Sequence, residues 1–154
     1  MVDISAYVAA VAQHLQDDSA LNALVDGQII PGFRRAAADI FLAGTHQACI
    51  GIRNLSKNSQ GLPGCAYHGL ANHDHLMEIR IITLLSATRQ DDSYAYAIGA
   101  EVERLLRDGF SETLNGITYN ISCIPNINFT ALDDDQFNDR IEIQATVRLK
   151  YLDA

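Results

Sequence analysis

Apolar residues near the start of the chain recur at the three- and four-residue spacing of one helix face. These positions are Ile4, Tyr7, Val8, Val11 and Leu15. The segment Asp17–Ser19 interrupts the pattern and offers cap oxygens for a further short helical turn, which ends at Gly27, a residue suited to a left-handed cap. The pattern therefore predicts a helical region that ends near residue 26.

A second helix is predicted after Asp91–Ser93, which supplies N-cap oxygens and negative charge at the helix start. Its apolar stripe consists of Tyr94, Ile98, Val102, Leu105 and Leu106, and Gly109 ends it. Glu103 and Arg107 stand four residues apart on its outer face and form a weak ion pair there.

Four stretches alternate apolar and polar residues with the period of a strand: 48–53, 76–85, 117–124 and 141–151. The second is apolar on both faces toward its end, which is typical of a central strand. Asn115-Gly116 precedes the third and suits a two-residue hairpin turn. Strands joined by turns, with two principal helices on one face, predict an α+β fold with a mainly antiparallel sheet, formed as one domain over residues 1–154.

Residues 54–75 are polar, rich in Gly and aperiodic, and we expect them to form a long loop. Loops of this length are uncommon in compact domains unless they have a function. A second exposed feature is the acidic segment 132–139, which contains Asp133, Asp134 and Asp135 and is expected at a hairpin tip. It lacks the alternating ligands, the Gly and the final Glu of a calcium-binding EF-hand loop.

The charge balance, the length of the apolar runs and the cysteine spacing each exclude some classes of function. The chain has 154 residues, and Lys+Arg 11 against Asp+Glu 19 gives a formal net charge of −8. This balance argues against a protein that binds phosphates over a broad surface. No apolar run approaches the length of a membrane span, and the first residues lack the pattern of a secretory signal. Cys49, Cys65 and Cys123 are without CxxC spacing and are expected to be reduced thiols.

Only the histidines suggest a chemical site. His68, His73 and His75 lie close together in sequence, and three such side chains can ligate zinc. The simpler interpretation is that they are solvated histidines of a polar loop. The sequence contains no GxSxG, GxxxxGK[ST], GxGxxG or HExxH motif, so no catalytic constellation is indicated and no cofactor is expected. Arg34-Arg35 is expected to be a solvated turn.

The whole layout resembles the tail terminator, or tail-completion, proteins of long-tailed bacteriophages. The segments that carry the resemblance are 23–29, 78–85, 97–106 and 141–151, in the order helix end, central strand, helix and last strand. The resemblance implies a non-enzymatic virion protein at the neck end of the tail, assembled in the host cytoplasm. It implies a ring, expected to be a hexamer, that caps the tail tube, ends its polymerisation and joins it to the head connector.

The same resemblance implies the partners: other copies of the chain, the tail tube protein, the head-tail connector or neck protein and, if the tail is contractile, the sheath protein. DNA would pass through the lumen without specific binding, and no membrane is involved. We expect the protein interfaces in the two exposed segments. The residues expected there are Lys57, Leu62, Tyr67, His73, Asp133, Asp134, Asp135 and Phe137.

Three other functions remain open on the sequence. A head-side neck or connector protein of the same virion would share the ring and the acidity. A small metal-dependent enzyme would use His68, His73 and His75. A cytoplasmic ligand-binding domain would be a small fixed oligomer, typically a dimer, with an apolar pocket.

Overall fold

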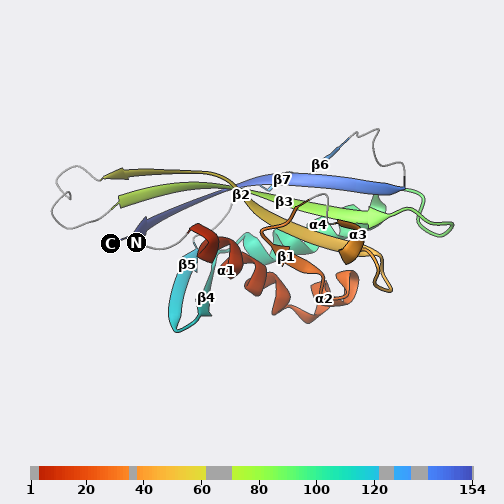
Figure 1. The fold of residues 1–154 in the computed structure, drawn as a ribbon, viewed down its shortest axis with the longest axis horizontal. Helices are drawn as coiled ribbons and strands as arrows, with labels where there is room; N and C mark the ends of the chain where they lie inside the picture. Colours follow the sequence, from red (N-terminus) through yellow and green to blue (C-terminus); the bar gives the residue numbers. More distant parts are fainter. Residues whose placement is uncertain (1–3, 35–37, 62–70, 122–126, 133–138, 154) are drawn as a thin grey trace.

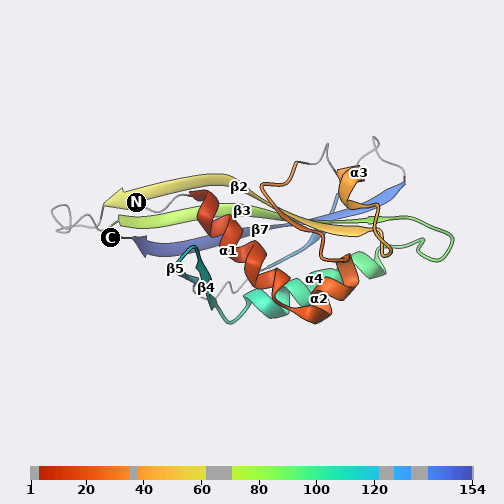
Figure 2. The same ribbon diagram turned by 60° about the horizontal axis from the view of Figure 1, so that its bottom comes forward.

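The computed structural model describes residues 4–34, 38–61, 71–121, 127–132 and 139–153 (Figures 1 and 2). The helices are α1 (Ile4–Gln16), α2 (Ser19–Val25), α3 (Ala38–Phe41) and α4 (Ser93–Leu106). The strands are β1 (Ile29–Pro31), β2 (Ala48–Gly61), β3 (Ala71–Leu84), β4 (Phe110–Leu114), β5 (Ile117–Ile121), β6 (Thr130–Ala131) and β7 (Arg140–Asp153).

The main sheet has five strands in the order β1-β2-β3-β7-β6. Its pairs are antiparallel except for β1 with β2, which are parallel. The predicted α+β class and the central place of the 76–85 strand are confirmed. Strands β4 and β5 form a separate hairpin, and Asn115 (φ 51°) and Gly116 (φ 79°) make its tight turn, as predicted.

The core lies between one face of the sheet and the helices α1, α2 and α4 (Figure 2). Apolar residues at alternate positions of the three long strands point into it, among them Ile50, Ile79 and Ile143, which are fully buried. The opposite face, called here the outer face, is covered at one end by α3. A smaller cluster forms there and consists of Phe33, Ala38, Leu42, Cys49 and Ile82. Helices therefore lie on both faces, although the two principal helices share one.

The helix ends follow the local sequence. Asp18 caps α2 by accepting a hydrogen bond of 2.8 Å from the Leu21 amide, and Asp26 closes the helix in the left-handed region at φ 54°. At the start of α4 the N-cap is Asp92, whose side chain makes no cap bond. The Asp91 carboxylate instead accepts from the amide and hydroxyl of Ser93, at 3.0 and 2.6 Å.

The prediction of a loop over 54–75 is wrong for most of that segment. Strand β2 continues to Gly61 and β3 begins at Ala71, so that only 62–70 lies outside the described residues. Alternation in a sequence marks a strand with one covered face. This part of the sheet extends beyond α1 and α4, and its strands are paired along the backbone to the last residues, a pairing that requires no such alternation (Figures 1 and 2). The predicted strand 117–124 is observed as far as Ile121, and its remainder lies outside the described residues.

Candidate assembly surface

The long strands extend as a three-stranded arm, defined as residues 53–61 of β2, 71–78 of β3 and 146–153 of β7. The arm occupies one end of the longest axis of the molecule, and the helical layer lies toward the other end (Figure 1). Its backbone ladder is continuous to the last pairs, Gly61 with Ala71 and Ala71 with Asp153. The arm is thus a continuously paired three-stranded sheet, and its base, which includes the fully buried Met77 and Val147, still packs on the core.

Both flanking strands stop where the arm begins. On one side, the last pair of β1 joins Pro31 to Ile52, which itself pairs with Ile79 of β3. On the other side, β6 pairs with β7 no further than Gln144, which is level with Arg80 of β3. Within the described ranges no strand flanks the arm on either side. Backbone N–H and C=O groups along such edges can accept another chain's strand.

The β2 edge of the arm begins beside an apolar groove of about 310 Å³. Its lining comes from α1, the end of β1 and the start of the arm, and consists of Val8, Ala9, Pro31, Gly32 and Asn54. A β-bulge follows directly, because the register shifts between Asn54 and Ser56. Leu55 lies at this bulge and is 44% exposed.

Where the arm joins the core, the outer face carries a ladder of charged side chains. Glu78 is buried and accepts from both Arg53 on β2 and Arg80 on β3, the latter at 2.6 Å. Arg80 also donates to Gln144 on β7, at 3.3 Å. The ladder therefore ties the three long strands together across the face that α1 and α4 leave open.

Only some of the residues expected at interfaces lie within the described part of the chain. Lys57 and His73 lie in the arm, on neighbouring strands, where Lys57 pairs with His75 and Ser59 with His73 in the backbone register. Leu62, Tyr67, Asp133, Asp134, Asp135 and Phe137 lie outside the described residues. The sequence thus indicated the region of the arm, but it indicated the wrong kind of structure for it.

The histidine hypothesis gains no support from the described part of the chain, where no group of three His, Cys, Asp or Glu side chains is placed to hold a metal ion. His68 lies outside the described residues. Cys49 is buried in β2, as its strand pattern predicted, and burial raises the pKa of its thiol to about 12. Such a thiol is chemically inert at neutral pH.

At the end of the sheet opposite the arm, polar contacts fix the loops. The Asp26 carboxylate accepts from the backbone amide of His46 at 2.7 Å and contacts its Nδ1 at 2.6 Å. Arg89 donates to the His46 carbonyl oxygen at 2.6 Å, and its guanidinium lies 3.8 Å from the ring centroid of Tyr94. Sequence analysis missed this cluster, because its members are far apart in the chain and no motif links them.

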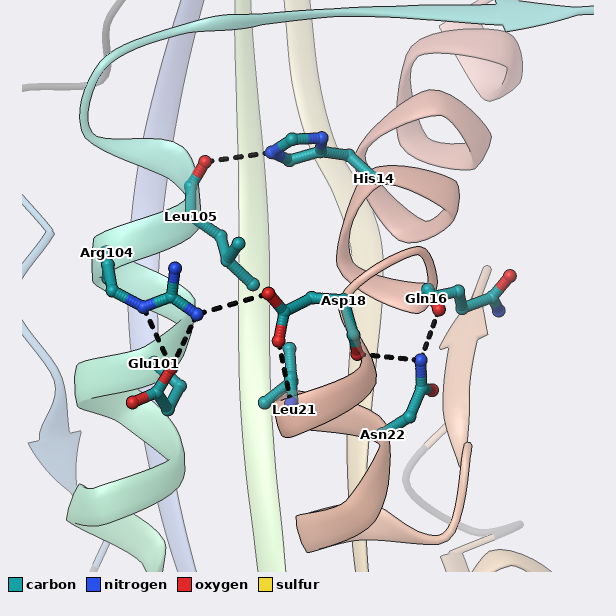
Figure 3. A network of polar contacts seen from close by, with 8 residues as sticks. All are labelled: His14, Gln16, Asp18, Leu21, Asn22, Glu101, Arg104 and Leu105. Carbon is teal, nitrogen blue, oxygen red and sulfur yellow. Dashed lines mark hydrogen bonds and ion pairs between the residues drawn. The ribbon is translucent and has the colours of Figure 1, made fainter.

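A second network fastens the helical layer (Figure 3). Arg104 on α4 binds Asp18 at 3.2 Å and Glu101 at 2.7 Å, and so links α4 to the cap of α2. His14 on α1 contacts the Leu105 carbonyl oxygen through Nε2 at 2.9 Å. The His14 ring also stacks on Phe110 of β4, with centroids 3.8 Å apart. These contacts hold the helices together and attach the β4–β5 hairpin, a structural role that leaves the arm as the candidate site.

No helix in the described ranges has the length and apolarity that a membrane crossing requires.

Comparison with known proteins gives similarity at the level of structure. No family model and no curated protein matches the chain. A chain in a solved structure described as "Virion of native gene transfer agent (GTA) particle" has a similar fold, with a TM-score of 0.57 and 19% sequence identity. The match covers 93% of this chain and 92% of that chain. The shared architecture therefore includes nearly the whole of both molecules.

Proposed function

We propose, on the premise of this fold shared with a chain of a gene transfer agent virion, that the protein is a structural component of a tailed virion. In this proposal it forms a ring, expected to be a hexamer, at the head end of the tail tube. The ring ends tube polymerisation and joins the tail to the head connector. No reaction is catalysed.

The observation that carries the proposal is the arm. A strand edge left open on both sides of a soluble domain is an aggregation hazard unless a partner covers it. Among the described residues, both edges lose their flanking strand at the same level of β3, near Ile79 and Arg80, and the ends of the long strands project beyond the helices (Figure 1). This geometry favours repeated association with copies of the same chain over a single small-molecule site.

The charge balance supports a passage for DNA. The net charge of −8 disfavours retention of phosphates in a channel that nucleic acid must cross. The basic side chains Arg53 and Arg80 on the outer face are partly neutralised by Glu78 between them. The contacts to the tube protein, the connector and any sheath protein are assigned, within this proposal, to the arm residues Lys57 and His73, to Leu62 and Tyr67 between the strands, and to the acidic segment 132–139.

The first test is the mass of the purified protein by light scattering, with negative-stain images of the same sample and of the sample mixed with tail tubes. Rings in solution or on tube ends support the proposal. A stable dimer that carries stoichiometric zinc overturns it in favour of the metal-dependent enzyme. Rings that bind the head connector and leave tube ends bare assign the protein to the head-side neck instead.

A matched pair of deletions tests whether ring formation depends on the arm or on the acidic segment 132–139. Replacing residues 56–75 by a two-residue Asn-Gly turn shortens the β2–β3 hairpin and leaves the core strands paired at Asn54 with Met77. This variant is expected to fold and to lose ring formation. Removal of residues 133–138 is the control of comparable kind, and it is expected to keep the ring. A shortened hairpin that still forms rings and caps tubes contradicts the role of the arm.

A further inference from the structure

We infer that neighbouring copies in the ring are joined edge to edge, with the open β2 edge of one arm paired in parallel with the open β7 edge of the next. The groove beside Pro31 then receives an apolar side chain from the incoming strand. This inference rests on the proposed ring, and it adds the pairing partners, their direction and the pocket.

Direction decides which edges can meet. Strand β2 is antiparallel to β3, and β3 is antiparallel to β7, so β2 and β7 run the same way. Rotation about an axis along the strands keeps their direction and brings a β7 edge beside a β2 edge in parallel. A two-fold axis across the strands would instead pair β2 with β2, or β7 with β7, in antiparallel fashion. Only the rotation uses both edges of every copy and closes a ring.

The β2 edge already accepts a parallel strand. Strand β1 pairs in parallel with β2 over Ile50, Gly51 and Ile52 and ends at Pro31, after which the Gly32 and Phe33 amides both donate to the Ile52 carbonyl oxygen as the chain turns. An incoming β7 edge would lie end to end with β1, in the same direction and on the same side of β2. The intramolecular strand thus shows which geometry this edge supports.

The groove indicates that the β2 edge receives the incoming strand. Val8, Ala9 and Pro31 give it an apolar lining, and it lies where β1 stops and the open edge begins. Strand addition derives affinity from main-chain bonds and specificity from side-chain pockets of this kind. The arm portion of β7 reads Arg-Leu-Lys-Tyr-Leu from residue 148 to 152, so the proposed occupant carries large apolar residues for such a pocket.

Cysteine cross-linking tests the pairing. Asn58 and Lys150 are level within one arm, because both pair with Asp74. Neighbouring strands lie about 4.8 Å apart, within the range that a disulfide bridges. The background is Cys65→Ser with Cys123→Ser, and the buried Cys49 is retained. Asn58→Cys is mixed with each of Thr146→Cys, Arg148→Cys, Lys150→Cys and Leu152→Cys, since strand tilt in a ring shifts the level at which copies meet.

A covalent dimer that forms in at least one mixture, and in neither of its two components alone, is the expected result. Combining the two substitutions in one chain should then give a ladder of products up to the ring size under non-reducing conditions. Efficient dimers of Asn58→Cys alone indicate two-fold pairing and overturn both the inference and the ring. Rings without any mixed cross-link overturn only the inference. A protein that stays monomeric and gives no mixed cross-link also overturns the inference.

The groove is tested separately with Ala9→Glu, which places a charge in the apolar pocket. We expect the concentration needed for half-maximal ring formation to rise at least about tenfold. Ala100→Glu on the exposed side of α4 is the matched control and should leave it unchanged. Thermal unfolding of both variants checks that the fold persists. Equal ring formation by the two variants overturns the assignment of the groove.

Discussion

Gly51 lies directly beneath the ring of Phe33 on the outer face. A Cβ atom at position 51 would clash with Phe33 Cγ, at a separation that real carbon atoms do not adopt. Phe33 is buried and anchors the small cluster under α3, so its ring has little freedom to move. Gly51→Ala is therefore expected to destabilise the protein by about 1–3 kcal/mol, measured by urea unfolding.

The cause of that loss can be isolated by a double-mutant cycle. Phe33→Ala alone leaves a cavity and is expected to cost about 3–5 kcal/mol. Because the missing ring makes room for the new methyl group, the double variant should lose less than the sum of the two single losses. Additive losses would mean that the clash is relieved elsewhere in the strand.

Glu78 is the only counter-charge that the ladder offers to the largely buried Arg80. Its side chain is 5% exposed and that of Arg80 12% exposed, whereas that of Arg53 is 40% exposed. Glu78→Ala leaves a buried guanidinium uncompensated and should cost about 3 kcal/mol. Arg53→Ala removes a partner that water can replace and should cost about 1 kcal/mol or less. Denaturant unfolding measures the loss of unfolding free energy in each variant. Equal losses would contradict the claim that Glu78 compensates the buried charge of Arg80.

The pair Asp26–His46 should make stability depend on pH in the acidic range. The hydrogen bonds from His46 lower the pKa of Asp26 below its usual value. Its contribution is therefore present above the unfolded pKa, near 3.9, and is lost as the pH falls through the folded pKa. Asp26→Asn keeps a residue that tolerates the left-handed backbone and should cost about 1 kcal/mol at pH 7. The difference from the unsubstituted protein should vanish at low pH in thermal unfolding.

Glu112 should show the opposite dependence. Burial, followed by the charge of Asp17, raises the pKa of this carboxyl, which also lies 4.0 Å from His14 Nδ1. An acid with a raised folded pKa favours the native state below its unfolded pKa, and this advantage is lost as the pH rises through the folded pKa. Glu112→Gln is thus expected to raise the unfolding temperature at pH 7 and to have no effect near pH 3. A lower unfolding temperature at pH 7 would contradict this account.

Periodicity predicted the elements that have one covered face. The stripe from Tyr7 to Leu15, the stripe of α4 and the alternation of β7 from Ile141 to Val147 reflect contact with the core, and the class and approximate bounds of these elements are confirmed. The same signal is missing from residues 54–61 and 71–75, which extend the paired strands β2 and β3 beyond the helical layer. Helix α3 has four residues, too few for a period to appear.

The candidate site was harder to predict than the fold. The unusual composition of 54–75 indicated a functional region, and Lys57 and His73 do lie in the arm. The open edges, however, depend on where β1 and β6 stop relative to β3, a relation among residues about 50 to 100 positions apart. The groove depends likewise on α1 meeting the end of β1. Such relations exist only after folding, so a pattern along the sequence does not contain them.

The direction of the three long strands also sets how the molecule responds to force. They run along its longest axis, and their ladders extend over the full length of each strand (Figure 1). A pull along that axis loads all the hydrogen bonds of a ladder together, in shear. A pull across it opens them one after another, as a zipper does. The sheet is therefore stiff along the strands and weak across them, so its mechanical resistance depends on the direction of the load.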